Sequence, residues 1–119
     1  MKTILIIEDE KSIRQLYQEE LEEEGYRVIL ASDGIDGIYK LRNENVDVVV
    51  LDIKMPNIDG RMAFRQIKEI RNDIPIIVNT AYDKYRSDFE QLKADAYIVK
   101  SFDLNELKET LKRIIENPK

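Results

Sequence analysis

The sequence predicts an α/β protein with a parallel sheet of five strands and helices on both of its faces. Two observations lead to this fold class. Short apolar stretches alternate with longer segments whose apolar residues recur at helical spacing, and this strand–helix unit occurs five times. The apolar stretches are rich in Val, Ile and Leu and contain few polar positions, which is typical of strands buried on both faces.

The first half of the chain contains three of these units. The strand over Thr3–Ile7 stops at a group of acids, and the helix after it carries an apolar stripe and ends before Gly25, a favourable residue just past a helix. The stretch Val48–Leu51 is wholly apolar, and Pro56 and Gly60 then turn the chain toward another helix. We expect strands over Thr3–Ile7, Tyr26–Ala31 and Val48–Leu51, and helices over Ser12–Glu24, Gly34–Asn43 and Arg61–Arg71.

The second half contains two further units, of which the first has a short and polar helix. The last helix has a clear apolar face, and Asp103 with Glu106 three residues on resembles a capping box at its start. We expect a strand from Pro75 to Thr80, a helix over Asp83–Lys93, a strand over Ala96–Val99 and a last helix that closes at Asn117.

Length and composition restrict the function. The 119 residues suit one domain, residues 1–119, without an output domain, and the first residues reach acids too early for a signal peptide. No stretch approaches the 18 apolar residues of a membrane span, and the absence of cysteine fits a reducing cytosol, so we expect a cytoplasmic protein. The net charge of −5 and the scattered basic residues make nucleic acid a poor partner. Without cysteine or histidine, any chemistry depends on carboxylates, hydroxyls and lysines.

Polar residues follow four of the predicted strands at their carboxyl ends. They are Glu8 and Asp9, Asp52, Thr80 and Lys100. Ligands bind beyond these ends in open parallel sheets, so the side chains are expected to converge on one crevice. Carboxylates packed together need a cation between them, and oxygen ligands suit Mg²⁺. With a lysine for phosphate oxygens and a carboxylate as acceptor, this group of residues indicates phosphoryl transfer to an aspartate.

Each of these residues also has an ordinary structural explanation. An acid at a strand end commonly caps a helix or belongs to a turn, a lone lysine is commonly solvated, and a threonine can serve as a turn hydroxyl. Capping is the less favourable explanation for Asp52, because Met55 and Pro56 intervene before the next helix. Five such residues at one edge of the sheet are hard to obtain by chance.

The chain resembles the receiver domains of response regulators in two-component signalling. The resemblance is carried by Glu8-Asp9 after I-L-I-I, by D-I-K-M-P-N-I-D-G from Asp52 to Gly60, by Thr80-Ala81 and by A-Y-I-V-K ending at Lys100. It implies a flavodoxin-like fold with strand order 2-1-3-4-5. It also implies Asp52 as phospho-acceptor, Mg²⁺ ligands from Glu8, Asp9, Asp52 and the Lys54 main-chain carbonyl, phosphoryl contacts from Thr80 and Lys100, and Tyr97 as the switch aromatic.

Two positions depart from the family pattern. Members usually have proline after the lysine of the fifth strand, often with a cis bond, whereas Ser101 stands there in this chain. A cis bond before a residue other than proline costs about 3–4 kcal/mol, so the geometry of this loop is open. Asp95 replaces a common glycine, and aspartate tolerates positive φ better than most residues.

The resemblance implies a sensor histidine kinase as phosphoryl donor and a protein that is not an enzyme with a separate substrate. A stand-alone receiver would pass the signal to a histidine phosphotransfer protein or other downstream protein, as the sporulation phosphorelay intermediate does, or bind a target as flagellar-motor receivers do. The alternatives are a Mg²⁺-dependent phosphatase of the haloacid dehalogenase type, a nucleotide-binding module, a flavodoxin and a receiver-like scaffold that is never phosphorylated. The phosphatases use a second aspartate two residues after the first, where this chain has Lys54.

Two further groups of residues are candidates for tuning the signal. Ile13, Leu16, Tyr17 and Phe102 are candidates for an apolar collar around the crevice that docks a helical histidine donor, with the alternative that Leu16 and Ile13 are core residues. Lys54 and Tyr82, each two residues past a site residue, are expected to border the phosphoryl group and lengthen its lifetime. The alternative is that both point to solvent.

Overall fold

A computed structural model describes residues 1–54, 59–101 and 103–116, and it contains five strand–helix units in chain order. The strands are β1 (Thr3–Ile7), β2 (Arg27–Ala31), β3 (Val48–Leu51), β4 (Ile76–Thr80) and β5 (Ala96–Val99). The helices are α1 (Lys11–Glu23), α2 (Gly34–Asn43), α3 (Gly60–Ile70), α4 (Arg86–Gln91) and α5 (Asn105–Glu116).

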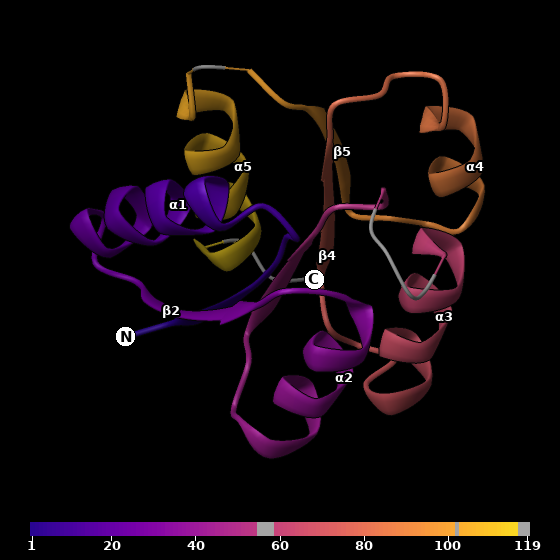
Figure 1. Ribbon diagram of the computed structural model, residues 1–119, viewed down its shortest axis with the longest axis horizontal. Coiled ribbons are helices and arrows are strands. Elements are labelled where there is room, and N and C mark those ends of the chain that lie inside the picture. Colours follow the sequence, from indigo (N-terminus) through magenta and orange to yellow (C-terminus); the bar gives the residue numbers. More distant parts are fainter. Residues whose placement is uncertain (55–58, 102, 117–119) are drawn as a thin grey trace.

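All five strands are parallel and lie in the order β2-β1-β3-β4-β5. The predicted flavodoxin-like fold and its strand order are therefore confirmed. Helices α1 and α5 cover one face of the sheet, and α2, α3 and α4 cover the other (Figure 1). This order places β1 and β3 side by side at the centre, with β4 next to β3, so their carboxyl ends share one edge.

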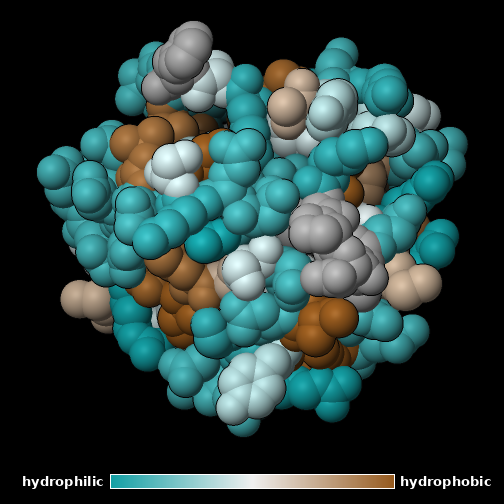
Figure 2. All heavy atoms as spheres, in the orientation of Figure 1, coloured by the Kyte–Doolittle hydropathy of each residue, from teal (hydrophilic) through white to brown (hydrophobic). Residues whose placement is uncertain are grey.

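The core has two layers because alternate strand residues point to opposite faces of the sheet. Leu5 and Ile7 pack under α2 and α3, whereas Ile4 and Ile6 pack under α1 and α5. The face in Figure 2 is mostly hydrophilic, with hydrophobic atoms in separate groups, as amphipathic helices predict. Within the described residues, none of the helices combines the length and apolar character needed to cross a membrane.

Local sequence sets most helix ends as expected. Gly25 follows α1 with φ 95°, a conformation that glycine adopts at little cost. Asp103 lies at the start of α5 as predicted, and its carboxylate accepts the main-chain N–H of Asn105 (2.8 Å) rather than the Glu106 N–H of a capping box. Gly60 begins α3 against Ile53, where an added Cβ would lie 2.6 Å from the Ile53 carbonyl oxygen. Glycine at this position therefore lets α3 start directly behind the loop that carries Asp52.

The α4 region differs from the sequence prediction. The helix covers only Arg86–Gln91 instead of Asp83–Lys93, because Phe89 alone is buried along it and Lys93 adopts φ 66° just past its end. The positive φ expected near the strand start thus falls on Lys93, and Asp95 has a different role. Its carboxylate accepts the main-chain N–H of Ile76 (2.8 Å) and joins the starts of β4 and β5. No peptide bond within the described ranges, Lys100–Ser101 included, is cis.

Candidate active site

The carboxyl ends of β1 and β3 bring three carboxylates together. Ile7 pairs with Leu51 in the parallel register, so Glu8 and Asp52 leave neighbouring strands at the same level. The Asp52 main-chain N–H donates to the Ile7 carbonyl (3.0 Å), which fixes the acid beside β1. One oxygen each from Glu8, Asp9 and Asp52 lies within 4.8 Å of the others. Glu8 and Asp52 are buried and Asp9 is exposed, so the group opens to solvent on one side.

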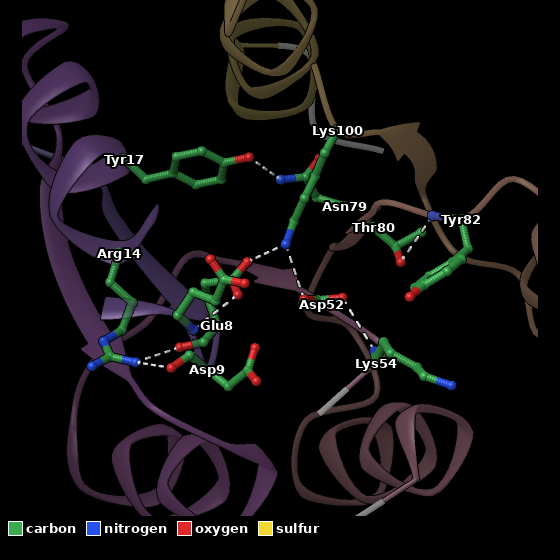
Figure 3. A network of polar contacts seen from close by, with 11 residues as sticks. Glu8, Asp9, Arg14, Tyr17, Asp52, Lys54, Asn79, Thr80, Tyr82 and Lys100 are labelled. Atoms are coloured by element: carbon green, nitrogen blue, oxygen red, sulfur yellow. Dashed lines mark hydrogen bonds and ion pairs between the residues drawn. The ribbon is translucent and has the colours of Figure 1, made fainter. Parts of the chain in front are cut away.

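Lys100 bridges two of these carboxylates. Its Nζ contacts Glu8 Oε1 and donates to Asp52 Oδ2 at 3.0 Å (Figure 3). The residue reaches this position from the end of β5, where its main-chain N–H donates to the Thr80 carbonyl (2.7 Å). Burial opposes the ammonium charge, but the hydrogen bond to Glu8 and the nearby Asp52 charge outweigh burial and raise the pKa of Lys100. The lysine is therefore held as a cation inside the acid group.

One lysine does not neutralise this site. Burial raises the pKa of Glu8, and the hydrogen bond from Lys100 offsets that effect only in part. Three carboxylates against one ammonium leave excess negative charge in a partly buried crevice. Oxygen donors with one open side match the preference of Mg²⁺ for carboxylates completed by water. The residues present fit a magnesium ion.

Thr80 and Tyr97 are linked through the main chain of Tyr82. Thr80 is fully buried at the end of β4, and its hydroxyl accepts the main-chain N–H of Tyr82 at 3.4 Å. The Tyr97 hydroxyl donates to the carbonyl oxygen of the same Tyr82, and the Tyr97 ring is buried with its centroid 6.2 Å from that of Phe89. The structure thus holds Tyr97, the aromatic residue proposed for the switch, with its ring buried.

Lys54 and Tyr82 meet at the outer rim of the site. The Lys54 main-chain N–H donates to Asp52 Oδ1 (3.1 Å), while its side chain points away from Asp52 on the Tyr82 side (Figure 3). Its Nζ lies 5.7 Å from the centroid of the Tyr82 ring, within cation–π range. The Lys54 ammonium is therefore engaged with an aromatic ring in this structure.

The predicted collar residues separate into different environments. Ile13 is half-buried against the α1/α5 side of the core, and Leu16 is 46% exposed. Tyr17 is only 4% exposed, and its hydroxyl accepts from the Asn79 side-chain amide at 2.6 Å, so its inclusion in a surface collar is wrong. It faces the sheet from α1, where Asn79 satisfies its polar end. Phe102 lies outside the described residues.

Sequence reasoning missed Arg14 and Asn79. Arg14 reaches back over the loop after β1 and donates to the carbonyl oxygens of Glu8 and Asp9. The pattern gave no warning of this contact, because an arginine early in a helix is most often a surface residue. Asn79 did carry a signal: it is a polar residue inside the otherwise apolar strand I-I-V-N and therefore needed a buried partner.

Comparison with known proteins relates the chain to response regulators. A family model described as "Response regulator receiver domain" matches residues 4–112. The response regulator MprA of Mycobacterium sp. (strain KMS) is 38% identical over 106 residues, which cover 87% of this chain and 46% of that protein. The alkaline phosphatase synthesis transcriptional regulatory protein PhoP of Bacillus subtilis (strain 168) is 37% identical over 119 residues, which cover 96% and 48%. The chain spans about half the length of the curated relatives it matches.

Solved structures give the same relation. The response regulator protein TrrA from Thermotoga maritima, in complex with Mg²⁺-BeF, is 46% identical, with a TM-score of 0.90 over 96% of this chain and 99% of that one. A second structure contains TrrA bound to the histidine kinase ThkA, with 45% identity and a TM-score of 0.89 over 97% of this chain and 99% of that one. The likeness therefore extends over nearly the whole of both chains.

Proposed function

The chain belongs to the response regulator receiver domain family, and from this premise we propose that Asp52 accepts a phosphoryl group from a sensor histidine kinase. The observation that carries the proposal is the position of Asp52. It is 6% exposed, bonded to Lys100 at 3.0 Å, and within reach of two further carboxylates. A buried carboxylate in this position is suited to accept a phosphoryl group, because Lys100 offsets negative charge on one side and the two neighbouring carboxylates can hold a cation on the other.

In the proposed reaction, an Asp52 carboxylate oxygen attacks the phosphorus of a phosphohistidine. The new O–P bond forms as the N–P bond breaks, and the electron pair of that bond stays on the imidazole nitrogen. Glu8, Asp9 and Asp52, with the main-chain carbonyl of Lys54, would hold Mg²⁺, which when bound neutralises charge on the phosphoryl oxygens.

Lys100 and Thr80 have the donors that the new group needs. Lys100 already donates a hydrogen bond to Asp52, and with little movement one of its N–H groups would donate to a phosphoryl oxygen instead. The Thr80 hydroxyl, bonded at 3.4 Å to the Tyr82 N–H, is held only weakly and is free to donate to another phosphoryl oxygen. That TrrA, at 46% identity, was crystallised with Mg²⁺-BeF and with a histidine kinase supports both the metal and the donor.

We further propose that this receiver passes the phosphoryl group on, as a relay intermediate does. The contact of Lys54 with Tyr82 at the rim supports a long-lived phosphoryl group, which a relay requires. Phosphorylation-dependent binding to a target is the alternative output. It would work through Thr80 and Tyr97, whose hydroxyls both contact the main chain of Tyr82.

The test of the central proposal is phosphorylation by acetyl phosphate with Mg²⁺, followed by intact-protein mass spectrometry. We expect a mass increase of one phosphoryl group that requires Mg²⁺ and is absent in Asp52→Asn. Asp47→Asn is the matched control, since Asp47 is at the opposite end of β3 and bonds the Thr3 N–H. A mass increase that persists in Asp52→Asn would overturn the assignment.

The switch has its own test. Thr80→Ala should still accept the phosphoryl group on Asp52 but lose the phosphorylation-dependent change in the NMR signals of the Tyr97 ring. The reason is that the Thr80 hydroxyl is the group through which the phosphoryl oxygen would act on the Tyr82 main chain and hence on Tyr97. A normal Tyr97 response in Thr80→Ala would show that the two residues are not coupled.

A further inference from the structure

Arg14 is bonded to the main chain of both acids that follow β1. Arg14 is the fourth residue of α1, and its Nη1 donates to the carbonyl oxygen of Glu8 at 2.8 Å and to that of Asp9 at 2.9 Å (Figure 3). In the same figure, Arg14 lies on one side of these two residues and Asp52 on the other. The guanidinium therefore holds the loop from behind while the carboxylates face the crevice.

We infer that Arg14 is a positioning residue that sets the Mg²⁺ affinity of the site by fixing the main chain of Glu8 and Asp9. This inference rests on the proposed function, because it assigns a role toward the same metal site. Arg14 is not a ligand: it carries no acceptor, and the side-chain bonds that it makes to described residues go to carbonyl oxygens. Its effect would be on the direction in which the two carboxylates point.

Beyond Arg14, and apart from the contact of Lys100 with the Glu8 carboxylate, few bonds of the described residues hold the main chain of this loop. Only three residues separate the end of β1 from the start of α1. The Glu8 N–H is held by the Ala31 carbonyl (3.0 Å), and the Glu10 N–H donates to the Glu8 carboxylate (3.1 Å). The N-cap residue Glu10 makes no side-chain capping bond. Of the hydrogen bonds that the described residues make, those from Arg14 are the ones that reach both the Glu8 and the Asp9 carbonyls from a single group.

Charge and position predict opposite effects for the loss of Arg14. A guanidinium close to the metal site repels a cation, so removing its charge alone would strengthen Mg²⁺ binding. Removing the support of the two carbonyls would weaken binding, and the loss of groups that orient metal ligands typically costs 10–100-fold in affinity. The sign of the change therefore distinguishes the two effects.

The experiment measures the Mg²⁺ dissociation constant of unphosphorylated wild type and Arg14→Met by isothermal titration calorimetry, well below the melting temperature. We expect about tenfold weaker binding in Arg14→Met, at the lower end of the range for such orienting groups. Lys11→Met is the matched control. Lys11 is an exposed cation in the first turn of the same helix, and the structure shows no hydrogen bond or ion pair for it among the described residues. This control should bind Mg²⁺ as tightly as wild type or more tightly.

A second readout separates positioning from general stability. The amide NMR signals of Glu8, Asp9 and Glu10 should shift or broaden in metal-free Arg14→Met, with those of the remaining sheet unchanged. A lower melting temperature together with an unchanged dissociation constant would overturn the inference. Should Arg14→Met fail to fold, Arg14→Gln is the replacement. The glutamine side chain is neutral and too short to reach both the Glu8 and the Asp9 carbonyl.

The outcome also distinguishes this inference from the proposed function. If wild type binds Mg²⁺ and is phosphorylated on Asp52 while Arg14→Met binds equally well, the positioning role is wrong and the receiver function stands. If wild type itself binds no Mg²⁺, both are wrong.

Discussion

The contact between Lys54 and Tyr82 makes the lifetime of the phosphorylated state a quantitative prediction. Both residues are tied to the site through their main chains, Lys54 to Asp52 at 3.1 Å and Tyr82 to Thr80 at 3.4 Å. Their side chains meet with the ammonium 5.7 Å from the ring centroid. We predict that the two side chains form a cover over the approach to Asp52, which water would have to pass to attack the phosphorus in line.

The strength of the cover sets the size of the effect. A cation–π contact at an exposed site is worth about 0.5–1 kcal/mol, and Tyr82 is 40% exposed. At about 1.4 kcal/mol per factor of ten, this contact favours the closed cover about 2–5-fold. If water attacks only when the cover is open, breaking the contact should speed hydrolysis by about the same 2–5-fold.

The substitutions are Lys54→Asn and Tyr82→Glu, each of which removes one side of the contact. In both variants the hydrolysis rate should rise by more than the roughly 2–5-fold expected from loss of the contact alone. The reason is that the new side chains are shorter or polar, and their oxygens can accept a hydrogen bond from the attacking water. Tyr82→Phe is the matched control, since it keeps the ring and should leave the lifetime unchanged. Lys84 also lies 5.7 Å from the Tyr82 ring but has Tyr85 as a second partner at 5.2 Å, so Lys84→Gln should have little effect.

The assay follows loss of the phosphoryl group with Mg²⁺ present after the phosphodonor has been removed. Because the two side chains act as one cover, the double variant should hydrolyse more slowly than the product of the two single effects predicts. No acceleration in either single variant or in the double variant would refute the reasoning. Acceleration in Tyr82→Phe would instead assign the effect to the tyrosine hydroxyl.

Three further predictions concern the metal, the kinase and a buried hydroxyl. At 100 times its dissociation constant, Mg²⁺ should stabilise the protein by about 2.7 kcal/mol, and Asp9→Asn should abolish this gain in a thermal melt while raising metal-free stability through reduced carboxylate repulsion. Ile13→Ala should slow transfer from a kinase more than phosphorylation by acetyl phosphate, and equal losses would exclude a docking role. Tyr17→Phe should cost about 1–3 kcal/mol at neutral pH, because it leaves the Asn79 amide unpaired. Burial raises the pKa of the Tyr17 hydroxyl, so the neutral tyrosine stabilises wild type fully below about pH 10. This stabilisation is lost as pH rises through the raised pKa. Denaturant unfolding at that pH should therefore show a smaller difference in unfolding free energy between wild type and Tyr17→Phe.

The sheet was predictable because its buried strands appear in the sequence as short apolar runs. A parallel strand covered on both faces is mostly apolar, and Val48–Leu51 is apolar at every position. The helix α4 was predicted too long for the converse reason. Its segment has one buried anchor, Phe89, so packing rather than pattern decides where it ends, and the conformation of Lys93 cannot be read from the neighbouring residues.

The convergence of the strand-end residues was predictable once the sheet was parallel. Glu8, Asp52 and Lys100 each follow a strand directly and Thr80 ends one, so strand order alone brings them to one edge. Contacts made across the fold by long side chains were not. Tyr17 and Asn79 are 62 residues apart and pair only because the long Tyr17 side chain reaches from α1 to the end of β4.

The charges around Asp52 explain why metal binding and phosphorylation should favour each other. The carboxylates of Glu8, Asp9 and Asp52 and the ammonium of Lys100 together carry a net charge of two negative units. Conversion of Asp52 to an acyl phosphate adds about one further negative unit, which makes three. Two positive units from Mg²⁺ bring the first state to neutrality and the second to one negative unit. Each state is therefore stabilised by the metal, and the phosphorylated state starts from the larger excess of negative charge.

By linkage, the factor by which phosphorylation tightens Mg²⁺ binding equals the factor by which Mg²⁺ favours the phosphorylated protein. In this structure Lys100 contacts both Glu8 and Asp52, and its single positive charge offsets part of the repulsion between these two buried acids.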